Sequence, residues 1–379
     1  MRRAKALSMG DAPFIFHKRT SASLMWATVV ALVPALAWGI FCFGFSATIP
    51  VVASIGGALA GEAIASGLMR RFTLWDGSAF LTGLLVGMAM PPGISPFIPA
   101  TASFFAVSVV KGAFGGLGSN WMNPALAGIA FALLDWPTEM NTWIMPRHLT
   151  ALSGISGATP LSLARSHAAS SFAGSSNIDI LGSGSFKVSG IDTTVTDTLN
   201  RGVFAPLGAD LPGGYIDLLV GNKHGAVGEL SAILILAASV ILISRKVIRW
   251  QIPATIVGSF AALTWIFGGL AAGDGYFTGD VLFSVLTGSF LLVSFFMAPD
   301  PVTTPSSRVG MVIFGIGIGT LSFLLRTFGS SAEGSAFAVI LMNCAVPTLV
   351  KIDIGAFRRR ASKMAALAEN RGADTSGAR

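Results

Sequence analysis

Residues 23–45, SLMWATVVALVPALAWGIFCFGF, form an apolar run without a charged side chain. A helix needs about 20 mostly apolar residues to cross a lipid bilayer, and this run is long enough. The whole chain has a matching composition, with 53% hydrophobic and 11% charged residues and a mean hydropathy of +0.71. Soluble domains carry about one-quarter charged residues. The sequence therefore predicts an integral membrane protein, and its excess of basic residues indicates membrane topology, with no nucleic acid as partner.

Further apolar segments follow along the chain, and the predicted fold class is an all-α integral membrane protein with about ten transmembrane helices. They cover residues 23–45, 50–69, 78–90, 96–110, 121–134, 229–244, 253–272, 281–297, 309–325 and 335–350. Pro91-Pro92-Gly93 separates the third segment from the fourth. Without this break the two could be taken for one kinked helix.

Basic residues indicate which loops face the cytoplasm. With the N-terminus inside, Lys and Arg gather in the cytoplasmic segments and the short outer loops hold only Arg326. Cytoplasmic loops carry such an excess, whereas long loops cross the membrane largely regardless of charge. We therefore expect both termini on the cytoplasmic side of a bacterial or archaeal cytoplasmic (inner) membrane. The expected parts are a cytoplasmic segment 1–22, a first membrane repeat 23–134, an extracytoplasmic loop 135–228, a second membrane repeat 229–350 and a basic cytoplasmic tail 351–379 beside lipid headgroups.

Similar short motifs occur in the two halves of the chain. DGSAFLTG at 76–83 precedes the Pro91-Pro92 break, and DVLFSVLTG at 280–288 precedes Pro299-Asp300-Pro301. Because five spans separate the copies, the second half would be inverted in the membrane. Inverted five-helix repeats with broken helices place binding sites near their pseudo-twofold axis. The alternative is that the similarity between the two halves arises by chance, since Pro and Gly are frequent in membrane helices.

Residues 156–161 read SGATPL and lie in the long polar loop. Ser156, Gly157 and Ala158 are small, so the backbone and the Thr159 hydroxyl can approach a phosphate closely. This arrangement suits the phosphate of a flavin mononucleotide (FMN). It is also typical of an ordinary loop in which Thr159 caps a helix that starts at Pro160.

Four other polar residues are candidates for sites within or beside the membrane. Glu62 lies in the second apolar segment, where a charge is costly, and is a possible ion-path residue. A carboxyl that stays protonated or pairs with a neighbouring helix would explain Glu62 equally well. Asn120, Asn123 and Asp300 could bind a flavin ring with their amide and carboxyl groups, although turn formation and helix termination account for them too.

The cysteines and histidines indicate no catalytic site and no metal site, and we predict neither kind of site. Cys42 and Cys344 stand in separate apolar runs and are predicted to be buried packing thiols. His17, His148, His167 and His224 show no metal-ligand spacing and are predicted to be solvated loop residues. No GxGxxG fingerprint follows a predicted strand, so this chain alone would not oxidise NADH.

Taken in order, the motifs resemble the D-subunit family of the Rnf electron-transport complex and its sister, the B subunit of the sodium-pumping NADH:quinone reductase. They are DGS at 76–78, FGGLG at 114–118, Asn120, NPA at 123–125, SGAT at 156–159, PGG at 212–214, GN at 221–222, GE at 228–229, RWQIP at 249–253 and DPV at 300–302. The resemblance runs from the first span to Val350. Pro160-Leu161 after the Thr is more similar to the Rnf family.

This resemblance implies a cofactor set and partners. FMN would be joined to the Thr159 hydroxyl through a phosphoester by a flavin transferase, and a second, non-covalent flavin (riboflavin) would bind in the membrane region. Partners would be other membrane subunits, a peripheral flavoprotein subunit and iron–sulfur subunits. The implied function is electron transfer through flavin in an ion-translocating ferredoxin:NAD oxidoreductase. The alternatives are the quinone-reductase subunit and a flavin-free channel or transporter for a small solute.

Overall fold

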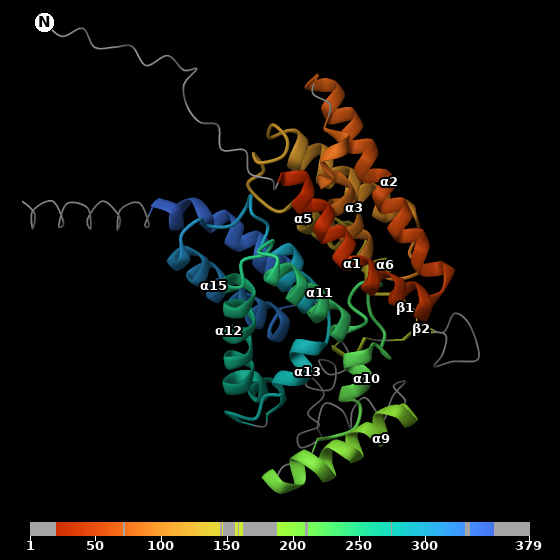
Figure 1. Ribbon diagram of the computed structural model, residues 1–379, viewed down its shortest axis with the longest axis vertical. Coiled ribbons are helices and arrows are strands. Elements are labelled where there is room, and N and C mark those ends of the chain that lie inside the picture. The colour runs from red at the N-terminus through yellow and green to blue at the C-terminus, as the bar shows by residue number, and fades with distance from the viewer. Residues whose placement is uncertain are drawn as a thin grey trace, which may run out of the picture.

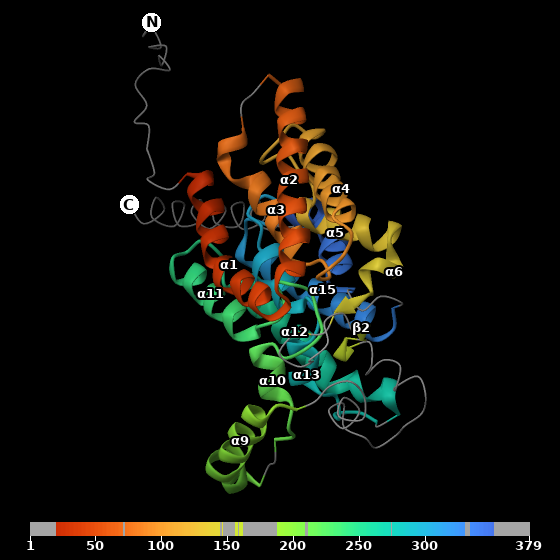
Figure 2. The same ribbon diagram turned by 90° about the vertical axis from the view of Figure 1, so that its right-hand side faces the viewer.

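The computed structural model of the protein describes residues 20–70, 73–144, 146, 156–157, 159–161, 188–208, 211–273, 275–329 and 334–351. These residues are almost entirely helical, and the helices of the two halves lie side by side (Figures 1 and 2). One pair of two-residue strands interrupts the all-α pattern. The predicted segments 1–22 and 351–379 lie almost wholly outside the described residues, as does most of the loop between 145 and 187.

The first half of the chain forms one group of helices, red to yellow in Figure 1. These are α1 (Ser21–Phe43), α2 (Phe45–Leu68), α3 (Ser78–Met88), α4 (Phe97–Phe105), which continues as the π-helical η2 (Ala106–Gly112), and α5 (Pro124–Asp135). Thr20 caps α1, and its hydroxyl accepts the Ser23 N–H at 3.2 Å. Gly44 alone joins α1 to α2, and its φ of 71° is a left-handed value that a residue with a side chain rarely adopts.

The second half forms the green to blue group. It contains α11 (Ala232–Ser244), α12 (Gln251–Phe267), α13 (Val281–Leu286), α14 (Phe290–Leu292), which continues as the π-helical η7 (Val293–Met297), α15 (Arg308–Thr327) and a last helix, Gly334–Lys351. Between the halves lie α6 (Pro137–Met140), β1 (Trp143–Ile144), β2 (Ser156–Gly157), α9 (Gly190–Leu199) and α10 (Tyr215–Val220). In Figures 1 and 2, α9 projects from one end of the molecule.

Within the part of the chain that the structure describes, five helices are long and apolar enough to cross a membrane, and each overlaps one of the predicted spans. They are Ser21–Phe43, Phe45–Met69, Gln251–Leu270, Arg308–Thr327 and Gly334–Lys351. The predicted spans 78–90, 96–110, 121–134 and 229–244 correspond to shorter apolar helices of 10–17 residues. The predicted span 281–297 is divided between α13, α14 and η7.

Two helices are broken inside the bundle, one between α3 and α4 and the other between α13 and α14. Other groups bind the backbone ends that the breaks leave free. The break at Pro91-Pro92-Gly93 is confirmed, since α3 ends at Met88 and α4 begins at Phe97. Gly228 N–H donates to the Met88 carbonyl at 2.7 Å, so the segment that precedes α11 binds the end of α3. The last carbonyls of a helix have no partner within it, and a buried end needs such a contact.

The helices approach closely through small residues. A Cβ placed on Gly83 of α3 would lie 2.7 Å from the Ile55 Cα of α2, and one on Gly57 would lie 2.1 Å from the Ala100 carbonyl oxygen of α4. Small residues at contact points are the usual basis of helix association in lipid. The larger of the two apolar clusters among the described residues extends from α1 to the last helix and joins both halves.

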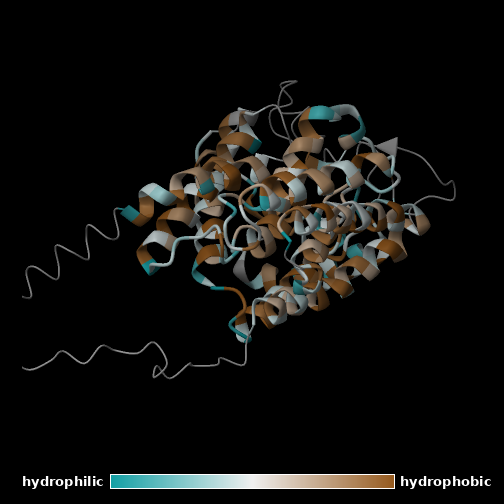
Figure 3. Cartoon of the chain, turned by 90° about the horizontal axis from the view of Figure 1, so that it is seen from above, coloured by the Kyte–Doolittle hydropathy of each residue, from teal (hydrophilic) through white to brown (hydrophobic). Residues whose placement is uncertain are grey.

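Most residues of the helices are hydrophobic, as their brown colour in Figure 3 shows. Large apolar side chains are exposed on α1, α2, α11 and α15, among them Val33, Val52, Val240 and Ile316. A soluble protein rarely leaves such continuous apolar surface in water, so these faces fit a lipid environment. Cys344 also faces outward, which corrects its prediction as a buried thiol, whereas Cys42 is buried as predicted. Apolar surroundings alone do not separate a lipid-facing thiol from a core thiol.

Candidate functional site

The segment around Thr159 lies at the end of the bundle where α1 turns into α2. Ser156 and Gly157 form β2, which pairs antiparallel with β1. Ile144 of β1 lies against Gly93, where an added Cβ would meet its Cδ1 at 2.5 Å. Gly93 N–H in turn donates to the Ser46 carbonyl at 3.1 Å. The backbone on either side of the break between α3 and α4 thus holds this segment in place.

Thr159 itself is buried, with 8% of its surface exposed, and Ala158 lies outside the described residues. Leu161, two residues later, packs at the break between α13 and α14. A Cβ on Gly288 would lie 3.4 Å from Leu161 Cδ2 and 3.2 Å from Arg326 Nη2. The guanidinium of Arg326 is therefore close to the chain that follows Thr159, and its positive charge suits a phosphate.

Two buried cations bind the C-terminal end of α13. Arg326 Nη1 donates to the Ser284 carbonyl at 3.0 Å, and Nη2 donates to the Thr287 carbonyl at 2.8 Å. Lys223 Nζ donates to the Leu286 carbonyl. Cations are favourable at a helix C-terminus, where the backbone carries partial negative charge. Arg326 was expected in an outer loop, but it belongs to the last turn of α15 and is only 5% exposed.

His224 follows Lys223 and is also buried, at 4% exposure, which corrects its prediction as a solvated loop residue. Burial lowers the pKa of its imidazole, because the charged form is poorly solvated there. The segment that contains it folds against the broken end of α3, an arrangement that no local sequence pattern indicates. The other three histidines lie outside the described residues.

A cavity of about 80 Å³ lies at the other end of α1. It brings Asn120, Asn123 and Asp300 together from two distant parts of the sequence. Its apolar walls include Leu24, Leu81, Leu85, Leu117, Ile248 and Phe296, and its other polar side chains are Thr28, Ser78, Thr82 and Lys111. Apolar walls with a few convergent polar groups are typical of a binding site for a small organic molecule.

The two asparagines are buried, at 6% and 5% exposure, and both are partly engaged. Asn123 caps α5, because its Oδ1 accepts the Ala125 N–H at 2.9 Å, and its Nδ2 donates to the Met297 carbonyl at 2.7 Å. Asn120 Nδ2 donates to the Met122 carbonyl at 3.0 Å. Asn123 therefore joins the first half of the chain to the end of η7 in the second half, in addition to lining the cavity.

Asp300 follows η7 in the turn that closes the cavity. Burial raises the pKa of its carboxyl from 3.8 to about 6, while hydrogen bonds from Val302 N–H and Thr303 oppose this shift. The Val302 N–H lies 3.3 Å from Oδ1. The group is therefore partly protonated near pH 6 and can either donate or accept a hydrogen bond inside the cavity.

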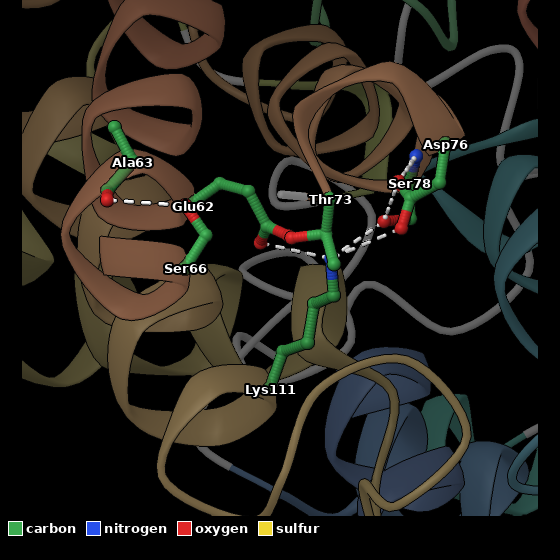
Figure 4. A network of polar contacts seen from close by, with 7 residues as sticks. All are labelled: Glu62, Ala63, Ser66, Thr73, Asp76, Ser78 and Lys111. Atoms are coloured by element: carbon green, nitrogen blue, oxygen red, sulfur yellow. Dashed lines mark hydrogen bonds and ion pairs between the residues drawn. The ribbon is translucent and has the colours of Figure 1, made fainter. Parts of the chain in front are cut away.

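Glu62 stands in a buried polar cluster beside this cavity, formed with Thr73, Asp76, Ser78 and Lys111 (Figure 4). Lys111 Nζ lies 2.8 Å from Glu62 Oε2 and 2.6 Å from Ser78 Oγ, and 3.9 Å from Asp76 Oδ2. The Thr73 hydroxyl donates to Glu62 Oε1. Of the alternatives for Glu62, pairing with a neighbouring helix is what this geometry shows.

Lys111 was not predicted from the sequence to be a site residue, although it is buried, with 2% of its surface exposed. The available signal was Glu62 itself, because an ionisable residue within a span requires a partner of opposite charge nearby. The helix end that carries Lys111 lies 49 positions away in sequence, so the pairing depends on how α2 packs against α4 and η2.

The two candidate sites lie at opposite ends of α1. Leu24 and Thr28, near its first residue, line the cavity, whereas Phe43 and Ser46 stand where the Thr159 segment is anchored. At a rise of about 1.5 Å per residue, this separation along the helix is about 30 Å. That length corresponds to the thickness of the hydrocarbon core of a bilayer.

A profile of the NQR2, RnfD, RnfE family matches residues 8–354. The D subunit of the proton-translocating ferredoxin:NAD(+) oxidoreductase complex of Clostridium ljungdahlii is 33% identical over 345 residues, covering 91% of this chain and 93% of that protein. The D subunit of the ion-translocating oxidoreductase complex of Stutzerimonas stutzeri is 34% identical over 334 residues, with 87% and 89% covered. The counterpart from the Na(+)-translocating complex of Acetobacterium woodii is 29% identical over 346 residues, with 90% and 92% covered.

Proposed function

This chain belongs to the NQR2, RnfD, RnfE family, and we propose that it is the D subunit of an Rnf-type ferredoxin:NAD oxidoreductase, the multi-pass membrane component through which electrons pass on bound flavin. The observation that carries this proposal is similarity over nearly the whole chain to proteins named as the D subunits of such complexes. Two relatives are named for different ions, so either protons or sodium ions suit the complex.

FMN is the cofactor proposed for Thr159, joined through a phosphoester by a flavin transferase. The residues fit such a group in two respects. Ser156 and Gly157, which precede the hydroxyl in β2, are small, as the approach of a phosphate requires, and Arg326 supplies a cation near Leu161. FMN would supply the redox chemistry, and the protein supplies its position at the outer face and its electrostatic surroundings.

A non-covalent flavin, riboflavin, is proposed for the cavity. Amide and carboxyl groups of Asn120, Asn123 and Asp300 suit the polar edge of a flavin ring, and leucine and phenylalanine side chains suit its faces.

The proposed architecture has ten crossings in two inverted five-helix repeats, with both termini cytoplasmic and Thr159 outside. Equivalent packing in the two halves supports the repeat, since α2 packs against α3 and α4 while α12 packs against α13 and α15. Lys111 and Arg326 stand at matching positions, each at the end of the helix packed on α2 or α12. The parts remain residues 1–22, 23–134, 135–228, 229–350 and 351–379.

Glu62 is proposed as a residue on an ion path that this chain contributes to the complex. Its burial and its oxygen-rich surroundings of Thr73, Asp76 and Ser78 support that role. The proposed partners are the other membrane subunits, a peripheral flavoprotein subunit, iron–sulfur subunits and the surrounding lipid.

The sister B subunit of a sodium-pumping NADH:quinone reductase and a flavin-free solute transporter are the alternatives. A component of the quinone reductase would deliver electrons to quinone, whereas the proposed complex exchanges them between ferredoxin and NAD. A transporter would contain no flavin.

The decisive experiment examines Thr159 directly. The chain is produced with a flavin transferase, separated on a denaturing gel under ultraviolet light, and the peptide around Thr159 is weighed by mass spectrometry. We expect a fluorescent band that Thr159→Ala abolishes and Thr159→Ser retains in part. Thr193→Ala, on the exposed helix α9, is the matched control and should leave the fluorescence unchanged. An unmodified wild-type peptide would refute covalent flavin.

A further inference from the structure

Lys111 belongs to two sites at once. Its ammonium forms the ion pair with Glu62 at 2.8 Å, and the same side chain lines the cavity that holds Asn120, Asn123 and Asp300. Ser78, which accepts from Lys111 Nζ at 2.6 Å, lines that cavity as well. Figure 4 shows the ammonium between the Glu62 carboxylate on one side and Ser78 and Asp76 on the other.

Water has little access to the Lys111 ammonium and its partners in this cluster. The side chains of Lys111 and Glu62 are only 3% and 4% exposed. In such surroundings, charge interactions are much stronger than in water, and a charge that loses its partner is strongly disfavoured. A buried carboxylate that shares one ammonium with a second site is therefore sensitive to whatever occupies that second site.

We propose that Lys111 couples the cavity to Glu62 by exchanging partners between the Glu62 carboxylate and a reducible heteroaromatic ring bound in the cavity. This inference rests on the proposed function, because it takes a flavin as the ring. Once an electron supplied through the complex gave a bound flavin negative charge, the Lys111 ammonium would turn toward it and break its ion pair with Glu62, and the Glu62 carboxylate would be left to bind another cation. No covalent bond would be made or broken in this exchange.

The local structure permits the exchange. Lysine carries its charge on a flexible four-carbon stem with three donors, so the ammonium can change partners by rotation of the side chain. Lys111 lies in the π-helical η2, and π-helical turns often occur at functional sites. Ser78 donates to Asp76 Oδ1 at 2.6 Å and faces the cavity, so the ammonium has an acceptor along its way.

Linkage makes the coupling measurable in both directions. If reduction of the ring weakens the Glu62–Lys111 ion pair by some factor, weakening of that ion pair must favour reduction of the ring by the same factor. This follows because the coupling between two equilibria is reciprocal. A fixed Lys111 would instead act only as a distant charge, and its effect would simply add to that of Glu62. The two cases are separated by a double-mutant cycle.

The test uses the membrane complex carrying Thr159→Ala, from which the peripheral flavoprotein subunit has been removed, so that the non-covalent flavin is read without the flavin of that subunit. Its reduced-to-oxidised ratio is measured at a fixed potential for Glu62→Gln, Lys111→Met and both together. We expect Glu62→Gln to raise the ratio about tenfold, because Lys111 is then free to approach the ring. In the Lys111→Met background, the same Glu62→Gln change should alter the ratio by less than about threefold.

Lys246→Met is the matched control, since Lys246 is exposed and precedes the cavity-lining Val247. It should leave the ratio unchanged. Equal effects of Glu62→Gln in both backgrounds would overturn the partner exchange while leaving the flavin assignment intact. Absence of a non-covalent flavin from the Thr159→Ala complex would overturn the proposed cavity ligand and, with it, this coupling.

A second measurement tests the proposal if the Lys111→Met protein fails to fold. Redox-difference infrared spectra should contain a carboxylate band that disappears in Glu62→Gln, because the Glu62 carboxylate changes its partner on reduction. In Glu62→Gln, the Asp76 carboxylate, 3.9 Å from Lys111 Nζ in the wild type, still supplies a negative charge nearby, so this variant should fold. Identical difference spectra in the two proteins would refute the exchange.

Discussion

Replacement of Asn123 by Ala tests how the two halves of the chain are held together. Asn123 is 5% exposed and uses both ends of its amide. Oδ1 accepts the Ala125 N–H at 2.9 Å and caps α5, and Nδ2 donates to the Met297 carbonyl at 2.7 Å. Loss of an N-cap costs about 0.5–2 kcal/mol. A buried carbonyl left without its donor costs about 1–3 kcal/mol more. Asn123→Ala should therefore destabilise the protein by about 1.5–5 kcal/mol.

Asn123→Ser separates these two contributions. A serine also caps a helix well, but its shorter side chain does not reach Met297, so only the carbonyl cost should remain. Equilibrium unfolding in mixed detergent micelles gives both free-energy differences against the wild type. The reasoning is refuted if Asn123→Ala lies within about 0.5 kcal/mol of the wild type, or if Ser costs as much as Ala at this position.

Two further substitutions test the packing and the cavity. Gly83→Ala should destabilise the α2–α3 pair by about 1–3 kcal/mol, because the new Cβ would overpack the contact; Gly56→Ala, where nothing lies within 4 Å, should be neutral or slightly stabilising in the same unfolding assay. Comparable losses at both glycines would contradict a steric cause. Asp300 has a folded pKa raised from 3.8 to about 6, so the stability that its neutral form contributes is complete below pH 4 and is lost as pH rises through 6. The thermal midpoint of Asp300→Asn should lack this fall between pH 4 and 7, and parallel pH profiles of the two proteins would refute it.

The apolar segments and the break at Pro91-Pro92-Gly93 were predictable, because length and Pro act locally along the chain. The division of the predicted span 281–297 at Thr287–Ser289 was not predicted. No proline marks that break. It depends on Arg326 and Lys223, which bind the carbonyls of α13 from distant positions in the sequence.

The candidate site shows the same limit. Asn120, Asn123 and Asp300 were singled out separately, and the structure brings them to one cavity. Lys111 was missed because its role follows from the packing of η2 against α2, which no local pattern encodes. Glu62 could be found from the sequence because it lies within an apolar span, whereas its partner Lys111 could be identified only from the fold.

The burial of Thr159 has a consequence for the order of biosynthesis. The transferase of the proposed function would have to present a bulky nucleotide to a hydroxyl that, in the finished fold, has 8% of its surface exposed and follows a strand paired to β1. The proposed attachment would therefore take place on a nascent or loosened chain, before β2 pairs with β1. After this pairing, the same contacts would shield the proposed ester from water and from enzymes that could cut it.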